Sequence, residues 1–261
     1  MDLKQIIKYI NYRLTAFTEH DLHSPFLYNF YMELIKNEFP FGDFEELQAV
    51  RKALQQTEVK LDVVDLGAGS KKLKSDTRTV SEIAKHGIAR QKQAEFMYRL
   101  VNKFVPATIV ELGTSIGLTT LYMAKGSPRS DIYTIEGSPK IAEFARKMCA
   151  QQQARNIQFI TGNFDEAFPH LLKSINHLDL LYLDGNHSYE PTMRYFELAL
   201  HKKTASSIFV FDDINWSEGM IKAWQKIISH PEVTLSLDLF HFGIVFFRAE
   251  QKNKEHFVLK F

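Results

Sequence analysis

Short apolar runs and helix-like segments alternate regularly from residue 107 to residue 229, and this alternation limits the possible fold more than any other feature. The runs have the length and composition of buried strands, and the segments between them carry apolar residues at helical spacing. We expect strands at 108–113, 131–136, 156–160, 178–183 and 207–211, followed in turn by helices at 117–125, 139–152, 165–174, 189–201 and 217–229. Such an order predicts an α/β fold with a doubly wound, mostly parallel sheet covered on both faces.

The C-terminal part departs from this alternation. Two further strands are expected near 233–238 and 242–248, and the few residues between them favour an antiparallel hairpin. With the five earlier strands they give a seven-stranded sheet of the Rossmann-like kind, and the tail at 256–261 is also strand-like.

Residues 1–105 are predicted to be an α-helical N-terminal cap and connector, and residues 106–261 the main domain. Ile6 to Leu14 follow helical spacing, Ser24-Pro25 reads as the start of a second helix, and residues 44–55 and 77–104 as further helices. The many aromatic residues of the cap leave three interpretations open: a roof over a substrate pocket, packing against the core, or contact with a second subunit in a homodimer.

Composition excludes several classes of protein. A formal net charge of +1 gives no indication of a nucleic-acid or membrane-surface partner. The single cysteine, Cys149, cannot form an intramolecular disulfide, which is typical of a reducing compartment. No apolar stretch is long enough to span a bilayer, and the N-terminus lacks a signal-peptide pattern, so we expect a cytoplasmic protein.

Residues 109–117, Ile-Val-Glu-Leu-Gly-Thr-Ser-Ile-Gly, read as a strand, a tight glycine turn and the start of a helix. Glycine lets a ligand approach the backbone, and the helix N-terminus presents free N–H groups. Glu136 ends the next strand 23 residues after Gly113, the usual place of an acid that binds ribose hydroxyls. The pattern predicts an adenosine-containing cofactor; a βα turn without a ligand is the alternative.

A second glycine-containing segment, residues 61–70, resembles such a turn at first sight. The residues after it, 71–76, are charged and have no apolar helical face, and no acid-ended strand follows at the right distance. We therefore interpret Asp65 to Ser70 as a structured loop.

The turn Gly113-Thr-Ser-Ile-Gly117 lacks the G-x-G-x-x-G pattern of dinucleotide-binding proteins. Glu-Leu-Gly-x-x-x-Gly followed by Thr119 resembles motif I of the class I S-adenosylmethionine (SAM) methyltransferases. This resemblance implies that SAM is the cofactor. By the same resemblance, Glu111 and the glycine turn would hold the methionine end of SAM, with Thr119 near the methionine carboxylate. Glu136 would bind the ribose, and the segment after the strand at 156–160 would lie beside the adenine. The cofactor-binding residues expected are Glu111, Gly113, Thr114, Ser115, Gly117, Thr119, Glu136, Gly137, Ser138, Asn163, Phe164 and Asp184.

Three carboxylates follow apolar strands. Asp184 comes after 180–183, and Asp212 and Asp213 come after 208–211. Carboxyl ends of parallel strands meet at one edge of a sheet, and like charges gathered there are unfavourable without a cation or hydrogen bonds. Mg²⁺ prefers such oxygen ligands, so a divalent metal site is predicted; the alternative is that the acids cap the helices that follow.

These acids resemble the ligands of metal-dependent O-methyltransferases of the catechol type and their sugar O-methyltransferase relatives. By that resemblance Asp184, Asp212 and Asp213 would hold Mg²⁺. His187 stands where the catechol-type enzymes have a lysine base, and Asn186, at the place of the base in the sugar branch, cannot act as one. The sequence departs from the pattern where Asp213 replaces a frequent Asn and where residues 203–207 replace a Pro-Gly-Gly turn.

The function expected is SAM-dependent methyl transfer, with metal-assisted O-methylation of a small hydroxylated acceptor. A non-catalytic SAM- or adenosine-binding regulatory module and a metal-independent methyltransferase remain alternatives. A nicotinamide-dependent oxidoreductase is disfavoured because the dinucleotide fingerprint is missing. The pattern does not distinguish O- from N-methylation and does not name the acceptor.

Overall fold

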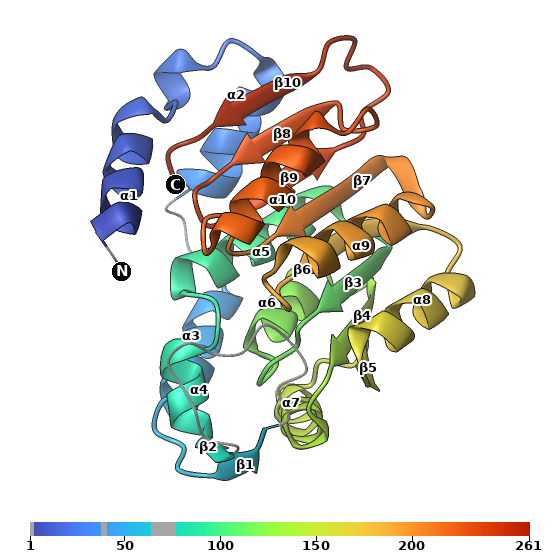
Figure 1. Cartoon of the computed structure of the whole chain (residues 1–261). Helices are drawn as coiled ribbons and strands as arrows, with labels where there is room; N and C mark the ends of the chain where they lie inside the picture. The colour runs from blue at the N-terminus through green and yellow to red at the C-terminus, as the bar shows by residue number, and fades with distance from the viewer. Residues whose placement is uncertain (1–2, 38–40, 64–76) are drawn as a thin grey trace. The chain divides into compact units, whose positions relative to one another are not determined.

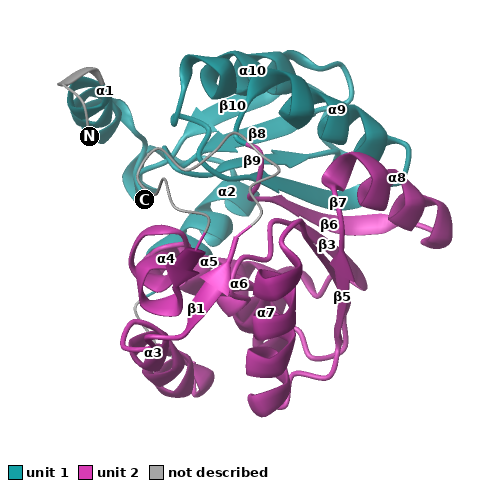
Figure 2. Cartoon of the chain, turned by 60° about the horizontal axis from the view of Figure 1, so that its bottom comes forward, with its two compact units in different colours: residues 1–38, 187–261 teal, residues 39–186 magenta. Residues whose placement is uncertain are grey.

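The computed structural model describes residues 3–37, 41–63 and 77–261, so the glycine loop at 65–70 lies outside the described residues. The chain forms two compact units, coloured separately in Figure 2. Unit 1 comprises Met1–Glu38 and His187–Phe261, and unit 2 comprises Phe39–Asn186. This division does not follow the expected boundary near residue 105, because the N-terminal helices are shared between the units; the domain assignment stays a prediction.

Unit 2 contains the first four strands of the alternating region, in the order β6-β3-β4-β5 and all parallel. The strands are β3 (Thr108–Leu112), β4 (Asp131–Glu136), β5 (Ile157–Thr161) and β6 (Leu178–Leu183), and the helices that follow β3, β4 and β5 are α6 (Leu118–Gly126), α7 (Pro139–Gln151) and α8 (Phe164–Ser174). Strands β3 and β6 are buried almost throughout, as expected for strands covered on both faces.

The start of unit 2 differs from the single helix expected over 77–104. It consists of α3 (Asp43–Leu54), β1 (Lys60–Asp62), β2 (Thr77–Thr79), α4 (Val80–His86) and α5 (Gln91–Phe104). Residues 77–79 pair with β1 instead of joining a helix. Thr79 caps α4 by accepting a hydrogen bond from the Glu82 backbone N–H, and Gly87 ends α4. The prediction was wrong because the helical periodicity of 80–104 conceals this break.

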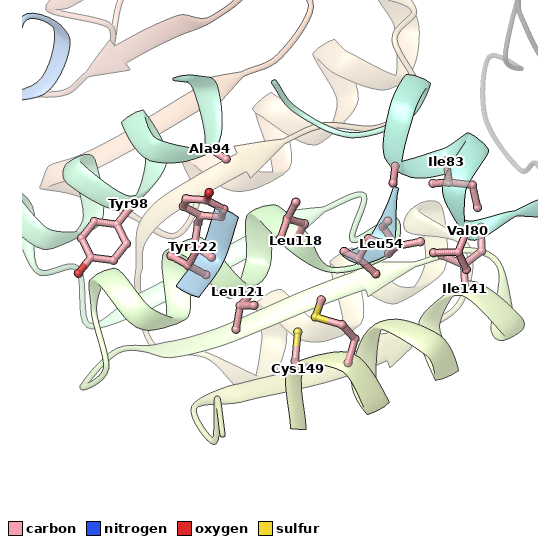
Figure 3. Close-up of a cluster of buried hydrophobic side chains, with 14 of the residues drawn as sticks. Leu54, Val80, Ile83, Ala94, Tyr98, Leu118, Leu121, Tyr122, Ile141 and Cys149 are labelled. Atoms are coloured by element: carbon pink, nitrogen blue, oxygen red, sulfur yellow. The ribbon is translucent and has the colours of Figure 1, made fainter. Parts of the chain in front are cut away.

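A cluster of buried side chains joins the helices of unit 2. Figure 3 shows Leu118, Leu121 and Tyr122 of α6 in this cluster together with Ile141 and Cys149 of α7. The thiol of Cys149 is free and buried. Burial raises the pKa of this thiol well above its usual range, with a smaller contribution from the Glu111 carboxylate.

Unit 1 combines the N-terminal helices with the C-terminal strands. Its elements are α1 (Leu3–Thr15), η1 (Glu19–Asp21), α2 (Pro25–Phe30), η2 (Tyr31–Ile35), α9 (Tyr189–Leu200), β7 (Lys203–Phe211), α10 (Glu218–Ser229), β8 (Leu235–Asp238), β9 (Gly243–Phe246) and β10 (Glu255–Val258). Strand β9 runs antiparallel to both β7 and β8, which confirms the expected hairpin, and β10 runs parallel to β8.

Two aromatic residues of the N-terminal cap, Phe30 and Phe44, pack in cores. Phe30 is fully buried, with its ring centroid 6.0 Å from that of Phe246 in unit 1. Phe44 is equally enclosed in unit 2, with its ring 5.0 Å from that of Tyr98. For these two residues, packing against the core is the interpretation that holds.

The α/β fold class with a mostly parallel sheet flanked by helices is confirmed. The sheet has eight strands in the described part of the chain, one more than expected, because the tail supplies β10. Among the described helices, none is long and apolar enough to cross a membrane.

Candidate functional site

The turn after β3 can be made only with glycine at its first position. Gly113 has φ +108°, and a Cβ there would lie 2.2 Å from the backbone oxygen of Asp184. Gly117 has φ +81°, and a Cβ on it would lie 3.0 Å from the Ala145 Cβ on α7. The two glycines therefore allow the strand to turn beside Asp184 and let α6 begin close against α7.

Glu136 is held next to this turn by two backbone N–H groups. Ser115, which has φ +49°, donates its N–H to Oε2 of Glu136 at 2.8 Å. Ser138 donates its N–H to Oε1 at 2.9 Å. The half-buried carboxylate is thereby fixed at the carboxyl end of β4, where both oxygens have a defined orientation.

Glu111, near the end of β3, is fully buried, whereas Glu136 is half-buried. Its Oε2 accepts hydrogen bonds from the hydroxyls of Thr120 (2.5 Å) and Thr134 (2.6 Å), and its Oε1 has no hydrogen-bond partner. Burial raises the pKa of Glu111 to about 7, although the two hydroxyls oppose the shift. At neutral pH this carboxyl is divided between its protonated and ionised forms.

The two threonines were missed by the sequence reasoning. Thr134 reaches Glu111 because the register of β3 and β4 sets these two residues opposite each other. Thr120 reaches it from the first turn of α6. Register follows from how the strands pair, and no local pattern in the sequence states it.

The segment after β5 lies against the end of β6. Asn163 caps α8 by accepting a hydrogen bond from the Asp165 backbone N–H at 3.0 Å. The ring of Phe164 packs on the backbone after Asp184, so that a Cβ on Gly185 would lie 2.6 Å from it. The backbone N–H of Asp184 donates to Leu112. Unit 2 thus brings Asp184 and Phe164 to the same edge as the glycine turn.

The remaining expected cofactor residues of unit 2 are more enclosed. Thr119 is 7% exposed in the first turn of α6, and Thr114 is 3% exposed in the glycine turn. Ser138, directly after Gly137, is fully buried, and its hydroxyl donates to the backbone oxygen of Asp62. Their part in cofactor binding stays a prediction.

The paired carboxylates of unit 1 follow β7. Asp212 is nearly buried, and its Oδ1 accepts the backbone N–H of Asp213 at 2.8 Å. Asp213 has φ +53°, a left-handed conformation that is uncommon for residues other than glycine and is found at functional turns. Burial lowers the pKa of His187, and the charge of Asp213 opposes that shift.

The Asp184 carboxylate belongs to unit 2, where it accepts a hydrogen bond from the Tyr182 hydroxyl at 3.0 Å. Within the described ranges, no group of three or more His, Cys, Asp or Glu side chains has an arrangement suited to a metal ion. The metal site expected from Asp184, Asp212 and Asp213 therefore remains a prediction.

Comparison with known proteins finds similarity to methyltransferases. A methyltransferase domain model matches residues 110–214. The catechol O-methyltransferase of Niastella koreensis is 26% identical over 153 residues, which cover 57% of this chain and 68% of that protein. The catechol O-methyltransferase of Mycobacterium tuberculosis is 24% identical, and the match covers 54% of this chain and 63% of that protein, somewhat less than two thirds of its length.

A solved structure has the same fold. The methyltransferase PaMTH1 of Podospora anserina, determined with bound S-adenosylhomocysteine (SAH), superposes with a TM-score of 0.62 over 87% of this chain and 97% of that chain, at 15% identity. Residues 110–214 thus match a methyltransferase domain, both sequence relatives are O-methyltransferases, and the solved structure shares the Rossmann-like fold.

Proposed function

We propose that this protein transfers the methyl group of SAM to a hydroxyl oxygen of a small acceptor molecule. The observation that carries the proposal is the Glu136 carboxylate, which the N–H groups of Ser115 and Ser138 fix beside the glycine turn. An acid at this place is suited to accept hydrogen bonds from the two ribose hydroxyls of an adenosine. The names of the catechol O-methyltransferase relatives and the SAH bound to the Podospora enzyme support the same activity.

The residues of unit 2 fit SAM. The buried Oε1 of Glu111 has no hydrogen-bond partner, so this carboxyl keeps acceptor capacity for the methionine end, and the N-terminus of α6 behind the glycine turn is suited to a carboxylate. Phe164, with Asn163 before it, offers an apolar surface for the adenine. When bound, SAM supplies an electrophilic methyl group on a positively charged sulfur.

The donor set Asp184, Asp212 and Asp213 fits a divalent metal by its chemistry. All three offer carboxylate oxygens, and the near-complete burial of Asp212 makes a neighbouring positive charge favourable. These residues would hold Mg²⁺, which lowers the pKa of a hydroxyl bound to it.

His187 is the base in this proposal. Because burial lowers its pKa, its imidazole is neutral at physiological pH and can accept a proton from the acceptor hydroxyl. With SAM bound, this oxygen would take the methyl group, and SAH would leave with the electron pair of the broken carbon–sulfur bond. Aligning oxygen and methyl carbon supplies much of the rate.

Isothermal titration calorimetry with SAM tests the proposal. Glu136→Ala should weaken binding at least about tenfold, because each hydrogen bond to a charged group contributes about 1.5–3 kcal/mol. Glu166→Ala, which removes an exposed acid at the start of α8, is the matched control and should bind like wild type. If the wild-type protein does not bind SAM, the proposed activity is wrong and the glycine turn has only a structural role.

The metal is tested separately by titrating Mg²⁺ into wild type and an Asp184→Ala/Asp212→Ala double variant, with exposed Glu190→Ala as control. Loss of Mg²⁺ binding in the double variant alone supports the metal-assisted reaction and justifies a screen of hydroxylated acceptors. SAM binding without Mg²⁺ binding by wild type would point to a metal-independent methyltransferase or a SAM-binding module.

A further inference from the structure

The two residues whose backbone N–H groups hold the Glu136 carboxylate also have hydrogen-bonded hydroxyls. The Ser115 hydroxyl donates to the backbone oxygen of Gly87 at 3.3 Å. The Ser138 hydroxyl donates to the backbone oxygen of Asp62 at 3.2 Å. Gly87 follows the last residue of α4, and Asp62 is the last residue of β1, so both hydroxyls reach the N-terminal part of unit 2.

Apolar packing fixes the two elements that carry these acceptor oxygens. Val80 of α4 lies in the buried cluster of unit 2 shown in Figure 3, and Leu61 of β1 belongs to the same cluster. The cluster also contains Leu118 of α6 and Ile141 of α7, the helices that follow the glycine turn and β4. We call β1 and α4, with Gly87 at the end of α4, the supporting segments. Because close-packed elements move little, their backbone oxygens are fixed points of attachment.

We propose that the hydroxyls of Ser115 and Ser138 position Glu136 for the ribose by tying its two backbone donors to the supporting segments. Each N–H group fixes one oxygen of the carboxylate, and each hydroxyl fixes the residue that supplies one N–H group. Ser115 and Ser138 are therefore positioning residues, whose hydroxyls act on the cofactor through Glu136. This role rests on the proposed function, because it presupposes that Glu136 binds the ribose of SAM.

The backbone conformation of Ser115 explains why this residue needs a second contact. Its φ of +49° lies in the left-handed region, which residues other than glycine adopt only at an energetic cost. Such a conformation persists where several contacts of the surrounding structure hold it together. Without the hydroxyl bond to Gly87, the turn can relax, and relaxation would rotate the Ser115 N–H away from Oε2 of Glu136.

The hydroxyl of Ser138 makes a long-range bond where a local one is usual. Ser138 is the residue before α7, a position at which serine commonly caps the helix with its side chain, as Ser217 does before α10. Ser138 makes no such capping bond, and its fully buried hydroxyl donates to Asp62 of β1 instead. The side chain therefore links the supporting segments to the residue that fixes Oε1 of Glu136.

A double-mutant cycle, measured by isothermal titration calorimetry of the full chain with SAM, tests the proposal. Ser115→Ala/Ser138→Ala should weaken SAM binding at least about fivefold, because residues in one hydrogen-bond network are coupled. In a Glu136→Ala background the same two substitutions should cause no further loss, since the group that they position is gone. An equal loss with and without Glu136 would indicate general damage to the turn and would overturn the proposal.

Ser174→Ala is the matched control for the cycle. The Ser174 hydroxyl also donates to a backbone oxygen of unit 2, but it lies at the last residue of α8, whereas Phe164 is the first. This variant should bind SAM like wild type. Circular dichroism of each variant verifies that the fold is retained, and if the double variant does not fold, Ser115→Ala and Ser138→Ala are carried through the same cycle singly.

Hydrogen exchange measures the same link from the supporting segments. Because coupling between two sites is reciprocal, saturating SAM should slow the exchange of backbone amides in β1 and α4 of wild type, and should slow it less in Ser115→Ala/Ser138→Ala. If wild type binds SAM without a change of exchange in β1 and α4, or if the double variant binds SAM as tightly as wild type, the positioning role is wrong and the proposed function stands. A wild type that does not bind SAM would overturn the proposed function and this role with it.

Discussion

The buried Glu111 should make the stability of this protein depend on pH in a way that one substitution removes. Burial raises the pKa of Glu111 from the ordinary 4.5 to about 7. Between these two values the folded state keeps a proton that the unfolded state has lost. The stabilisation from this residue is therefore fully present below about pH 4.5 and is lost as the pH rises through 7.

The size of the effect follows from the shift. A difference of about 2.5 pKa units, at 1.36 kcal/mol for each unit, corresponds to about 3 kcal/mol in the free energy of unfolding. Glu111→Gln is neutral at every pH and keeps an oxygen that can accept from Thr120 and Thr134. The difference in stability between the variant and wild type should thus shift by about 3 kcal/mol in favour of the variant between pH 4.5 and pH 8.

Urea unfolding at the two pH values measures this difference. Both tryptophans, Trp216 and Trp224, belong to unit 1, so circular dichroism is needed to follow the unfolding of unit 2, which contains Glu111. Other titrating groups are common to both proteins and cancel in the comparison. Exposed Glu166→Gln serves as control and should leave the pH dependence unchanged. A stability difference that is the same at pH 4.5 and pH 8 would refute the reasoning.

Two further substitutions test the backbone of the site. Gly113→Ala should abolish SAM binding and lower the melting temperature, because the new Cβ would lie 2.2 Å from the Asp184 backbone oxygen. Gly42→Ala is the control and should leave SAM binding and the melting temperature unchanged, because no atom lies within 4 Å of its new Cβ. Equal melting temperatures for the two variants would contradict the predicted clash. Asn163→Ala removes the cap of α8 and should cost about 1 kcal/mol in urea unfolding, with unchanged stability as the opposing result.

Most secondary-structure elements could be predicted from the sequence because their signals are local. The strand at Asp131–Glu136 and the helix that begins at Pro25 have the bounds or start that periodicity and capping indicate. The helix expected over 77–104 was wrong because 77–79 pair with β1, which lies earlier in the chain, and because the helical spacing of 80–104 continues across Gly87, where α4 ends. Likewise, only packing divides the N-terminal helices between two units.

The sequence by itself determined the α/β fold class, the glycine turn at Gly113 and the spacing that carries Glu136 to the end of the following strand, since each depends on residues close together in the chain. The tertiary structure alone decided that Glu111 is fully buried with Thr134 as its partner, because strand register sets that pair. It also decided that α1 turns its tyrosines inward and its isoleucines outward. Both faces of that helix are apolar enough to be buried, and contacts with the distant C-terminus select between them.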